Sequence, residues 1–173
     1  AIRTVAELRA HFRRPVLIVT GPLGPHNPDN ARYFQTLLAL RAELGLEDNV
    51  FLLAEWSRHF LPDSVIADFY RLADALFFPS LEEGFGLPML EAAISRLPIF
   101  CSDIPALRAL GEASAHFFSP HADPRQLAGE VAVRLEQDAV FRSAVDTRAH
   151  YSWEQICLRA VKPLLDGLFE RKS

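Results

Sequence analysis

The chain has 173 residues, of which 50% are hydrophobic, enough for one domain with a buried core and too few for two full domains. Its net charge is −4, with 18 basic and 22 acidic side chains and no basic stripe, which argues against a dedicated nucleic-acid binder. We recognise no signal segment and no apolar run near the roughly 20 residues that cross a bilayer, so no transmembrane segment is expected.

The N-terminal half is expected to contain, in chain order, a helix over residues 2–12, a strand over 16–20, a helix from 29 to 45 and a strand over 50–54. The strand at 16–20 is short, branched and fully apolar, and Gly21-Pro22 ends it, which is typical of a buried strand. Gly45 follows the last periodic residue of the second helix and is a typical helix-ending glycine.

The C-terminal half continues the alternation. We expect helices over residues 64–73, 87–95, 104–110 and 124 to about 137, and strands over 76–78, 98–101 and 116–118. Asp123-Pro124 supplies a cap and a first-turn proline for the last of these helices. Residues 139–170 are expected to be helical, with a break near Tyr151-Ser152.

Short apolar strands that alternate with helices predict βαβ units. We therefore expect an α/β domain with a Rossmann-like parallel sheet of about five or six strands, helices on both faces, and helices at the C-terminal end. In such sheets ligands bind outside the carboxyl ends of the strands. Functional residues are therefore expected in the loops that follow Thr20, Ala54, Phe78, Cys101 and Phe118.

One loop, residues 79–91, stands apart from the others. Gly84 and Gly86 allow positive φ and close approach of a ligand to the backbone. Pro88 suits the first turn of a helix, so the amides of residues 85–87 should be free donors at the positive end of a helix dipole. Such an arrangement is an anion site that fits a phosphate.

Two carboxylates flank this anion site. Glu83 precedes the glycines, and Glu91 lies about one turn into the helix. Their natural partners beside a phosphate are neutral hydroxyl groups, which donate charge-assisted hydrogen bonds to them. Phosphate on amides together with hydroxyls on carboxylates describes a sugar nucleotide, although both glutamates could instead be solvated surface residues.

The sequence shows no spacing pattern that is typical of a metal site. The histidines lack the spacing of a zinc site, and no Asp-x-Asp occurs, so we expect no metal and no cofactor. Two widely separated cysteines, Cys101 and Cys157, are expected to be reduced, buried thiols, which suits the cytoplasm.

Glu83, seven residues and Glu91, with Gly84-Phe85-Gly86-Leu87-Pro88 between them, resemble the signature of the group 1 glycosyltransferases (glycosyltransferase family 4, GT-B fold). Residues 73–80, 97–105 and 151–154 resemble the same family. The resemblance implies the C-terminal, donor-binding half of a GT-B enzyme that transfers a hexose from a nucleoside-diphosphate sugar with retention of configuration.

The resemblance also implies roles for single residues. Glu83 would be catalytic, accepting from donor-sugar hydroxyls and favouring positive charge at the anomeric carbon, and Glu91 would accept from the ribose. Gly84 and the amides of Phe85, Gly86 and Leu87 would hold the sugar and the diphosphate. The base, with uridine and guanosine favoured, would lie near Gly21, Trp56, Ser57 and Arg58.

We expect residues 1–173 to be one such domain, cut from a longer enzyme. Helices over about 139–173 would pack toward an N-terminal, acceptor-binding domain of the same protein. The Arg and Lys that neutralise the departing diphosphate in the family cannot be assigned here, so we expect no turnover from the isolated chain. The alternatives are another GT-B enzyme, namely a sugar-nucleotide epimerase or a phosphorylase, and a non-catalytic α/β module.

Overall fold

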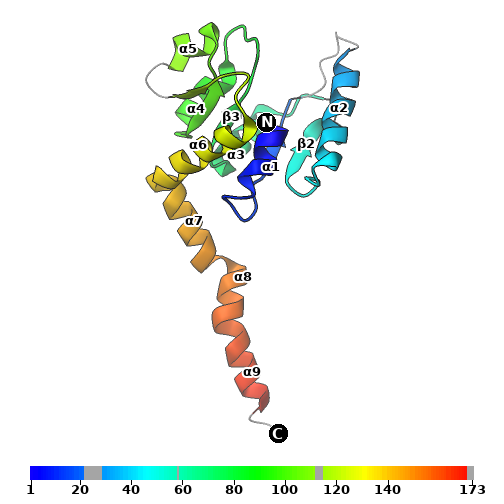
Figure 1. The fold of residues 1–173 in the computed structure, drawn as a ribbon. Coiled ribbons are helices and arrows are strands. Elements are labelled where there is room, and N and C mark those ends of the chain that lie inside the picture. The colour runs from blue at the N-terminus through cyan, green and yellow to red at the C-terminus, as the bar shows by residue number, and fades with distance from the viewer. Residues whose placement is uncertain (22–28, 58, 112–114, 171–173) are drawn as a thin grey trace. The chain divides into compact units, whose positions relative to one another are not determined.

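The computed structural model describes residues 1–21, 29–57, 59–111 and 115–170. They fall into two compact units, Ala1–Ala132 and Val133–Ser173. In the first unit, the elements shown in Figure 1 are α1 (Ile2–Leu8), β1 (Leu17–Val19), α2 (Asp29–Glu43), β2 (Val50–Leu52), η1 (Leu53–Glu55), α3 (Asp63–Leu72), β3 (Leu76–Phe78), α4 (Leu87–Ile94), β4 (Ile99–Ser102), α5 (Pro105–Gly111), β5 (Ala115–Phe118) and the first part of α6 (Pro124–Gln137).

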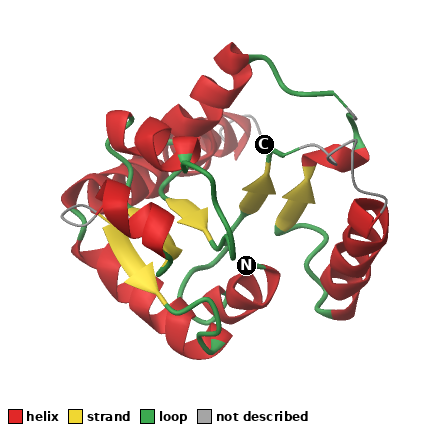
Figure 2. Ribbon diagram, turned by 90° about the horizontal axis from the view of Figure 1, so that it is seen from above, coloured by secondary structure: helices red, strands yellow, loops and turns green. Residues whose placement is uncertain are grey.

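The five strands in the described part of the chain are parallel, as predicted, but they form two sheets, seen as separate groups of arrows in Figure 2. The prediction of a buried strand over 16–20 was wrong: β1 is shorter, and Ile18 and Val19 are exposed because β1 lies in a sheet of only two strands. One sheet has the order β1-β2 and pairs Leu17 with Val50, and the other has the order β3-β4-β5. The single sheet of about five or six strands that was predicted is therefore not formed, because β1-β2 and β3-β4-β5 are not hydrogen-bonded to each other.

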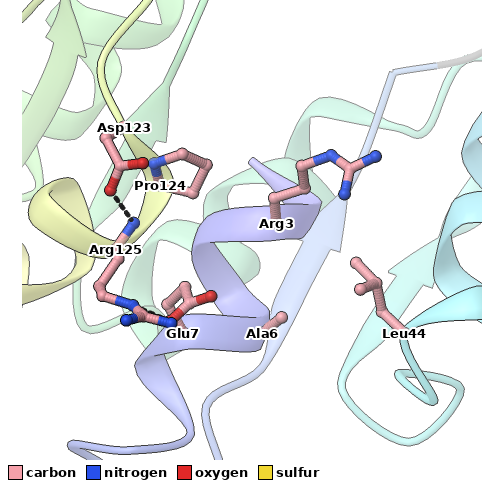
Figure 3. Close-up of a pocket in the computed structure, with 7 residues that line it drawn as sticks. All are labelled: Arg3, Ala6, Glu7, Leu44, Asp123, Pro124 and Arg125. Atoms are coloured by element: carbon pink, nitrogen blue, oxygen red, sulfur yellow. Dashed lines mark hydrogen bonds and ion pairs between the residues drawn. The ribbon is translucent and has the colours of Figure 1, made fainter.

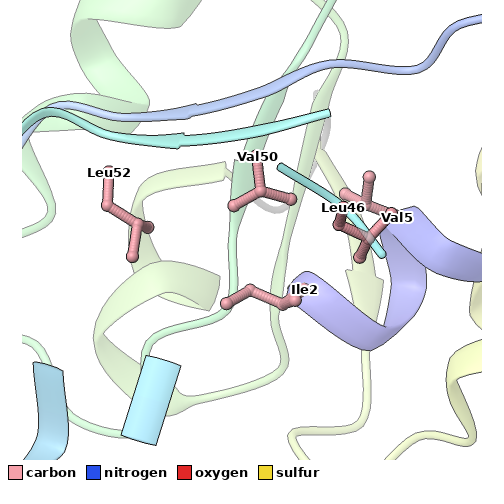
Figure 4. Packing of buried hydrophobic residues seen from close by; sticks show 5 residues of the cluster. All are labelled: Ile2, Val5, Leu46, Val50 and Leu52. Atoms are coloured by element: carbon pink, nitrogen blue, oxygen red, sulfur yellow. The ribbon is translucent and has the colours of Figure 1, made fainter. Parts of the chain in front are cut away.

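The two-stranded sheet has a core of its own, made by α1, β2 and the turn after α2. Its buried side chains are drawn in Figure 4 and are Ile2, Val5, Leu46, Val50 and Leu52. Leu46 enters this core because α2 ends in a left-handed glycine, Gly45, with φ +60°. The Leu46 amide donates to the Arg41 carbonyl and the Gly45 amide to the Ala42 carbonyl, the two bonds of a Schellman motif.

The three-stranded sheet is covered by α4 and α5. The buried side chains of its core are Met89, Ala92, Ile99, Cys101 and Leu107. Burial raises the pKa of the Cys101 thiol to about 11, so this cysteine is buried and protonated as expected. Cys157 is free but exposed, so the prediction that both thiols are buried was wrong for Cys157.

The helix predicted over residues 2–12 ends earlier, at Leu8. The chain continues in turns, in which the amides of His11 and Phe12 both donate to the Leu8 carbonyl. Pro15 follows shortly afterwards, and the residue before a proline is driven out of the helical region by steric contact. The apolar spacing therefore extended past the point where the backbone leaves the helix.

The second unit consists of the end of α6 followed by α7 (Ala139–Tyr151), α8 (Trp153–Ile156), the π-helical turn η2 (Cys157–Val161) and α9 (Lys162–Glu170). The predicted break is confirmed at Ser152, whose extended backbone separates α7 from α8 and whose hydroxyl accepts a hydrogen bond from the Gln155 amide. Large apolar side chains in this unit are exposed, among them Val140, Trp153 and Leu164. Their packing against an N-terminal domain stays a prediction.

Candidate functional site

The loop at residues 79–91 leaves the carboxyl end of β3 and runs into α4. Gly86 is the N-cap of α4 and lies in the left-handed region, with φ 84° and ψ 40°. A Cβ at this position would lie 2.8 Å from Cδ2 of Leu107 and 3.2 Å from Cδ1 of Leu110. Both the backbone conformation and the contact with α5 therefore demand glycine here, as predicted for Gly86.

Gly84 plays a different part from the one predicted. Its φ angle is not positive, and a Cβ atom built on it would meet no other atom within 4 Å. The prediction of positive φ was therefore wrong for Gly84, because the left-handed conformation before α4 is taken by Gly86. What Gly84 contributes is an exposed stretch of backbone with open space beside it.

The start of α4 presents unused amide groups. Within the described part of the chain, the amides of Phe85, Gly86 and Leu87 have no hydrogen-bond acceptor, whereas the Met89 amide donates to the Gly86 carbonyl at 3.0 Å. Pro88 occupies the first turn, as predicted. No side chain caps this helix, so its positive dipole end and the amides before it are available to an anion.

Glu83 is half-buried at the start of this loop. The Ser80 hydroxyl donates a hydrogen bond of 2.9 Å to its Oε1 atom. Ser80 lies two residues after the end of β3, so the start of the loop fixes one oxygen of the carboxylate. The remaining lone pairs can accept hydrogen bonds from a ligand.

Glu91 is exposed on α4 and is also held by a hydroxyl group. The Tyr70 hydroxyl of α3 lies 2.9 Å from Oε2 of Glu91 and 3.3 Å from the Pro88 carbonyl oxygen. Burial, followed by the hydrogen bond to Glu91, raises the pKa of Tyr70 well above its usual value. The tyrosine therefore stays a donor, and it reaches Glu91 from a helix that the sequence did not connect with this site.

The residues predicted to meet the base follow β2, in the other sheet. Trp56 is 65% exposed, with its ring centroid 6.4 Å from that of Phe51, so its face is open to a stacking partner. The Ser57 hydroxyl contacts only the neighbouring His59 backbone among the described residues. Gly21 is exposed at the end of β1, and Arg58 lies outside the described residues. Contact of these residues with the same ligand as Glu83 and Glu91 stays a prediction.

Glu55, which precedes Trp56, has a structural partner. Both of its carboxylate oxygens accept from Arg41 of α2, at 2.6 and 2.8 Å. The Glu55 hydrogen bond is also the main reason why the pKa of Arg41 is raised. Because both oxygens are used by one guanidinium, Glu55 is a poor choice for a ligand-binding carboxylate.

The structure also shows a pocket that the sequence did not suggest (Figure 3). It has a volume of about 470 Å³ and lies between α1, the end of α2 and the start of α6, lined by Arg3, Ala6, Glu7, Leu44, Asp123, Pro124 and Arg125. Arg125 pairs with Glu7 at 3.2 Å, and Asp123 caps α6 by accepting from two amides. None of the predicted site residues lines this pocket, and Arg125 and Glu7 in its lining are paired with each other.

A further charged pair follows β4. Arg108 donates two hydrogen bonds of 2.6 Å to Asp103, and these bonds are the main reason why the pKa of Asp103 is lowered. The guanidinium also lies 4.6 Å from the centre of the Phe117 ring. Beside this pair, the buried Ser102 hydroxyl has no hydrogen-bond partner among the residues that the structure describes.

Two classes of feature are not found in the described residues. No three or more His, Cys, Asp or Glu side chains gather there in a way that could hold a metal ion. Nor does that part of the chain contain a helix with the length and apolar character needed to cross a membrane.

The family model that matches this chain describes glycosyltransferases, and two similar curated proteins are glycosyltransferases by name. The family model described as glycosyl transferases group 1 matches residues 1–149. The serotype-specific mannosyltransferase WbdA of Escherichia coli is 40% identical over 86 residues, which are 48% of this chain and 10% of WbdA. A D-inositol 3-phosphate glycosyltransferase of Acidothermus cellulolyticus is 27% identical over 184 residues, covering 100% of this chain and 39% of that protein.

A solved structure supports the fold. The C-terminal domain of the glycosyl transferase group 1 family protein LpcC from Francisella tularensis is 22% identical and superposes with a TM-score of 0.61, covering 91% of this chain and 76% of that one. The likeness confirms the predicted Rossmann-like α/β fold. The chain spans well under half the length of the two curated relatives, 10% and 39%.

Proposed function

The chain belongs to the group 1 glycosyltransferases, and on that premise we propose that it binds the nucleotide-sugar donor in a retaining enzyme that transfers a hexose. The observation that carries the proposal is the start of α4, where unused amides adjoin two carboxylates, each held by a hydroxyl group. Backbone amides at a helix start donate hydrogen bonds to a diphosphate, and carboxylates accept hydrogen bonds from sugar hydroxyls. The donor base proposed is uridine or guanosine.

In the proposed reaction, the bond between the anomeric carbon and the diphosphate breaks, and the sugar passes through an oxocarbenium-like state. The amides of Phe85, Gly86 and Leu87 stabilise the negative charge on the departing diphosphate. Glu83 accepts hydrogen bonds from sugar hydroxyls and stabilises the positive charge at the anomeric carbon. Preorganised groups aimed at developing charge commonly make the largest contribution to catalysis.

Glu91 binds the ribose hydroxyls in this proposal. An acceptor hydroxyl attacks the face that the diphosphate leaves, and its proton passes to an oxygen of the departing diphosphate. No metal ion takes part, so the diphosphate charge is met by protein groups. The Arg and Lys that the family resemblance implies for neutralising the diphosphate are not assigned in this chain. We place the acceptor site on an N-terminal domain of the same protein. Residues 1–173 by themselves would then bind the donor weakly and not turn it over.

The proposal is tested by measuring thermal unfolding of the intact protein with UDP, GDP, ADP and their sugar derivatives. A ligand that binds only the folded state stabilises it, by about 2.7 kcal/mol when its concentration is 100 times Kd. We expect one nucleotide and its sugars to raise Tm and the others to do so less. If none of them raises Tm, the chain is not a donor-binding domain. Product analysis with the nucleotide sugar found in this way then separates transfer from epimerisation and phosphorolysis.

Replacing Glu91 by alanine should weaken nucleotide binding about tenfold, the value of one lost charge-assisted hydrogen bond of about 1.4 kcal/mol. Titration calorimetry with the nucleotide identified above measures the effect. Glu82→Ala is the matched control, because Glu82 is an exposed glutamate of the same loop. Equal affinities of Glu91→Ala and the wild-type protein would remove Glu91 from the binding site.

A further inference from the structure

The side chain of Tyr70 connects the core of the domain with the predicted ribose carboxylate. Its ring packs against the core formed by Met89, Ala92, Ile99, Cys101 and Leu107, so the position of the ring is fixed by packing. Its hydroxyl meets Glu91 of α4. The tyrosine thus spans from the last turn of α3 to the first turns of α4.

The geometry around the hydroxyl favours one acceptor. A tyrosine hydroxyl has a single proton, and its two neighbours are Oε2 of Glu91 at 2.9 Å and the Pro88 carbonyl oxygen at 3.3 Å. The shorter contact is also the charged one, so the proton is donated to Glu91. Oε2 is then fixed, while Oε1 and the remaining lone pairs of the carboxylate stay free to accept.

This contact matters because Glu91 is exposed. An exposed glutamate samples many rotamers, and ordering it when a ligand arrives costs free energy. A partner that already holds one carboxylate oxygen removes much of that cost before binding, which is preorganisation. No other side chain among the described residues donates a hydrogen bond to Glu91.

We propose that Tyr70 is a positioning residue that holds the Glu91 carboxylate ready for the two ribose hydroxyls of the nucleotide. The inference rests on the proposed function and adds a residue that acts through Glu91 without touching the donor. It makes ribose recognition a joint property of α3 and α4.

The test uses the intact protein and measures Kd by calorimetry for whichever of UDP, GDP and ADP binds most tightly. The same measurement is made with the 2′,3′-dideoxy form of that nucleotide, which lacks both ribose hydroxyls. The wild-type protein should prefer the ribonucleotide by about tenfold, and Tyr70→Phe, which keeps the ring, should lower that preference about fivefold. Tyr33→Phe, at a tyrosine that is 65% exposed on α2, is the control and should leave the preference unchanged.

A double mutant separates positioning from mere packing. In a Glu91→Ala background, Tyr70→Phe should have no further effect on the preference, because there is no carboxylate left to hold. A lower Tm with an unchanged preference would make Tyr70 only a structural link between two helices and would overturn the inference. An additional loss in the Glu91→Ala background would overturn it as well.

The inference and the proposed function fail in different ways. If the wild-type protein prefers the ribonucleotide and Tyr70→Phe preserves that preference in full, the role of Tyr70 is wrong and the proposed function stands. If the wild-type protein binds none of the three nucleotides, the proposed function fails and the inference fails with it.

Discussion

On the proposed mechanism, Glu83→Ala in the intact protein should lower kcat by about 10²–10³-fold, the range found when one preorganised electrostatic group is removed from an active site. The reason is that Glu83 is half-buried at the carboxyl end of β3, with one oxygen held by Ser80 at 2.9 Å. A charge held in this way needs little reorganisation when positive charge appears at the anomeric carbon. Steady-state kinetics with the nucleotide sugar identified by thermal unfolding measures the effect.

Two further variants sharpen the interpretation. Glu83→Gln keeps the size of the side chain and removes the charge, so a similar loss of kcat would assign the effect to the charge. Glu82→Ala changes the adjacent, exposed glutamate and should leave kcat near the wild-type value. Normal turnover in Glu83→Ala, with the protein shown to be folded, would exclude Glu83 from the mechanism.

The fold could be predicted because its signals are local. The run at 99–102 is apolar except for Ser102, and all four residues of β4 are buried, as expected for an inner strand of a parallel sheet. Gly45 and Ser152 mark helix boundaries through backbone chemistry that a single residue reveals. The separation into two sheets has no such local signal, because it depends on which strands pair.

Arg96 illustrates what local reasoning misses. It lies in the left-handed region at φ 60°, just after α4, where glycine is the usual residue. The Leu97 amide still donates to the Ala92 carbonyl, so the helix ends as a glycine would end it. Arg96 is an exposed arginine, and its side chain gives no sequence cue for this conformation.

The candidate site was predicted only in part, because some of its residues are brought together by contacts that the local sequence does not show. Glu83, Gly86 and Glu91 occur within nine residues, so one motif reveals them. Ser80 and Tyr70 matter through side-chain contacts, and Tyr70 comes from a different helix, 21 residues before Glu91. Contacts between elements depend on packing, which periodicity along one chain cannot supply.

Gly86→Ala should destabilise the domain by about 2–5 kcal/mol. The left-handed conformation contributes about 1–2 kcal/mol, because a Cβ clashes with the following carbonyl oxygen. The new methyl group would also lie 2.8 Å from Leu107, which is fully buried, and forced packing of this kind costs about 1–3 kcal/mol. The urea concentration at the midpoint of unfolding measures the change. An unaltered m-value would show that the substitution changes the free energy of unfolding and not the surface exposed on unfolding.

Gly84→Ala is the matched control, and it separates folding from binding at the same loop. Its backbone does not require glycine and its Cβ would meet nothing within 4 Å, so stability should change by no more than about 0.5 kcal/mol. If the open space beside Gly84 is where the donor approaches the backbone, nucleotide affinity should fall although the domain stays as stable as the wild type. Equal destabilisation by both substitutions would contradict the conclusion that only Gly86 of the two requires glycine. A stable Gly84→Ala variant with unchanged affinity would place the donor away from this stretch of backbone.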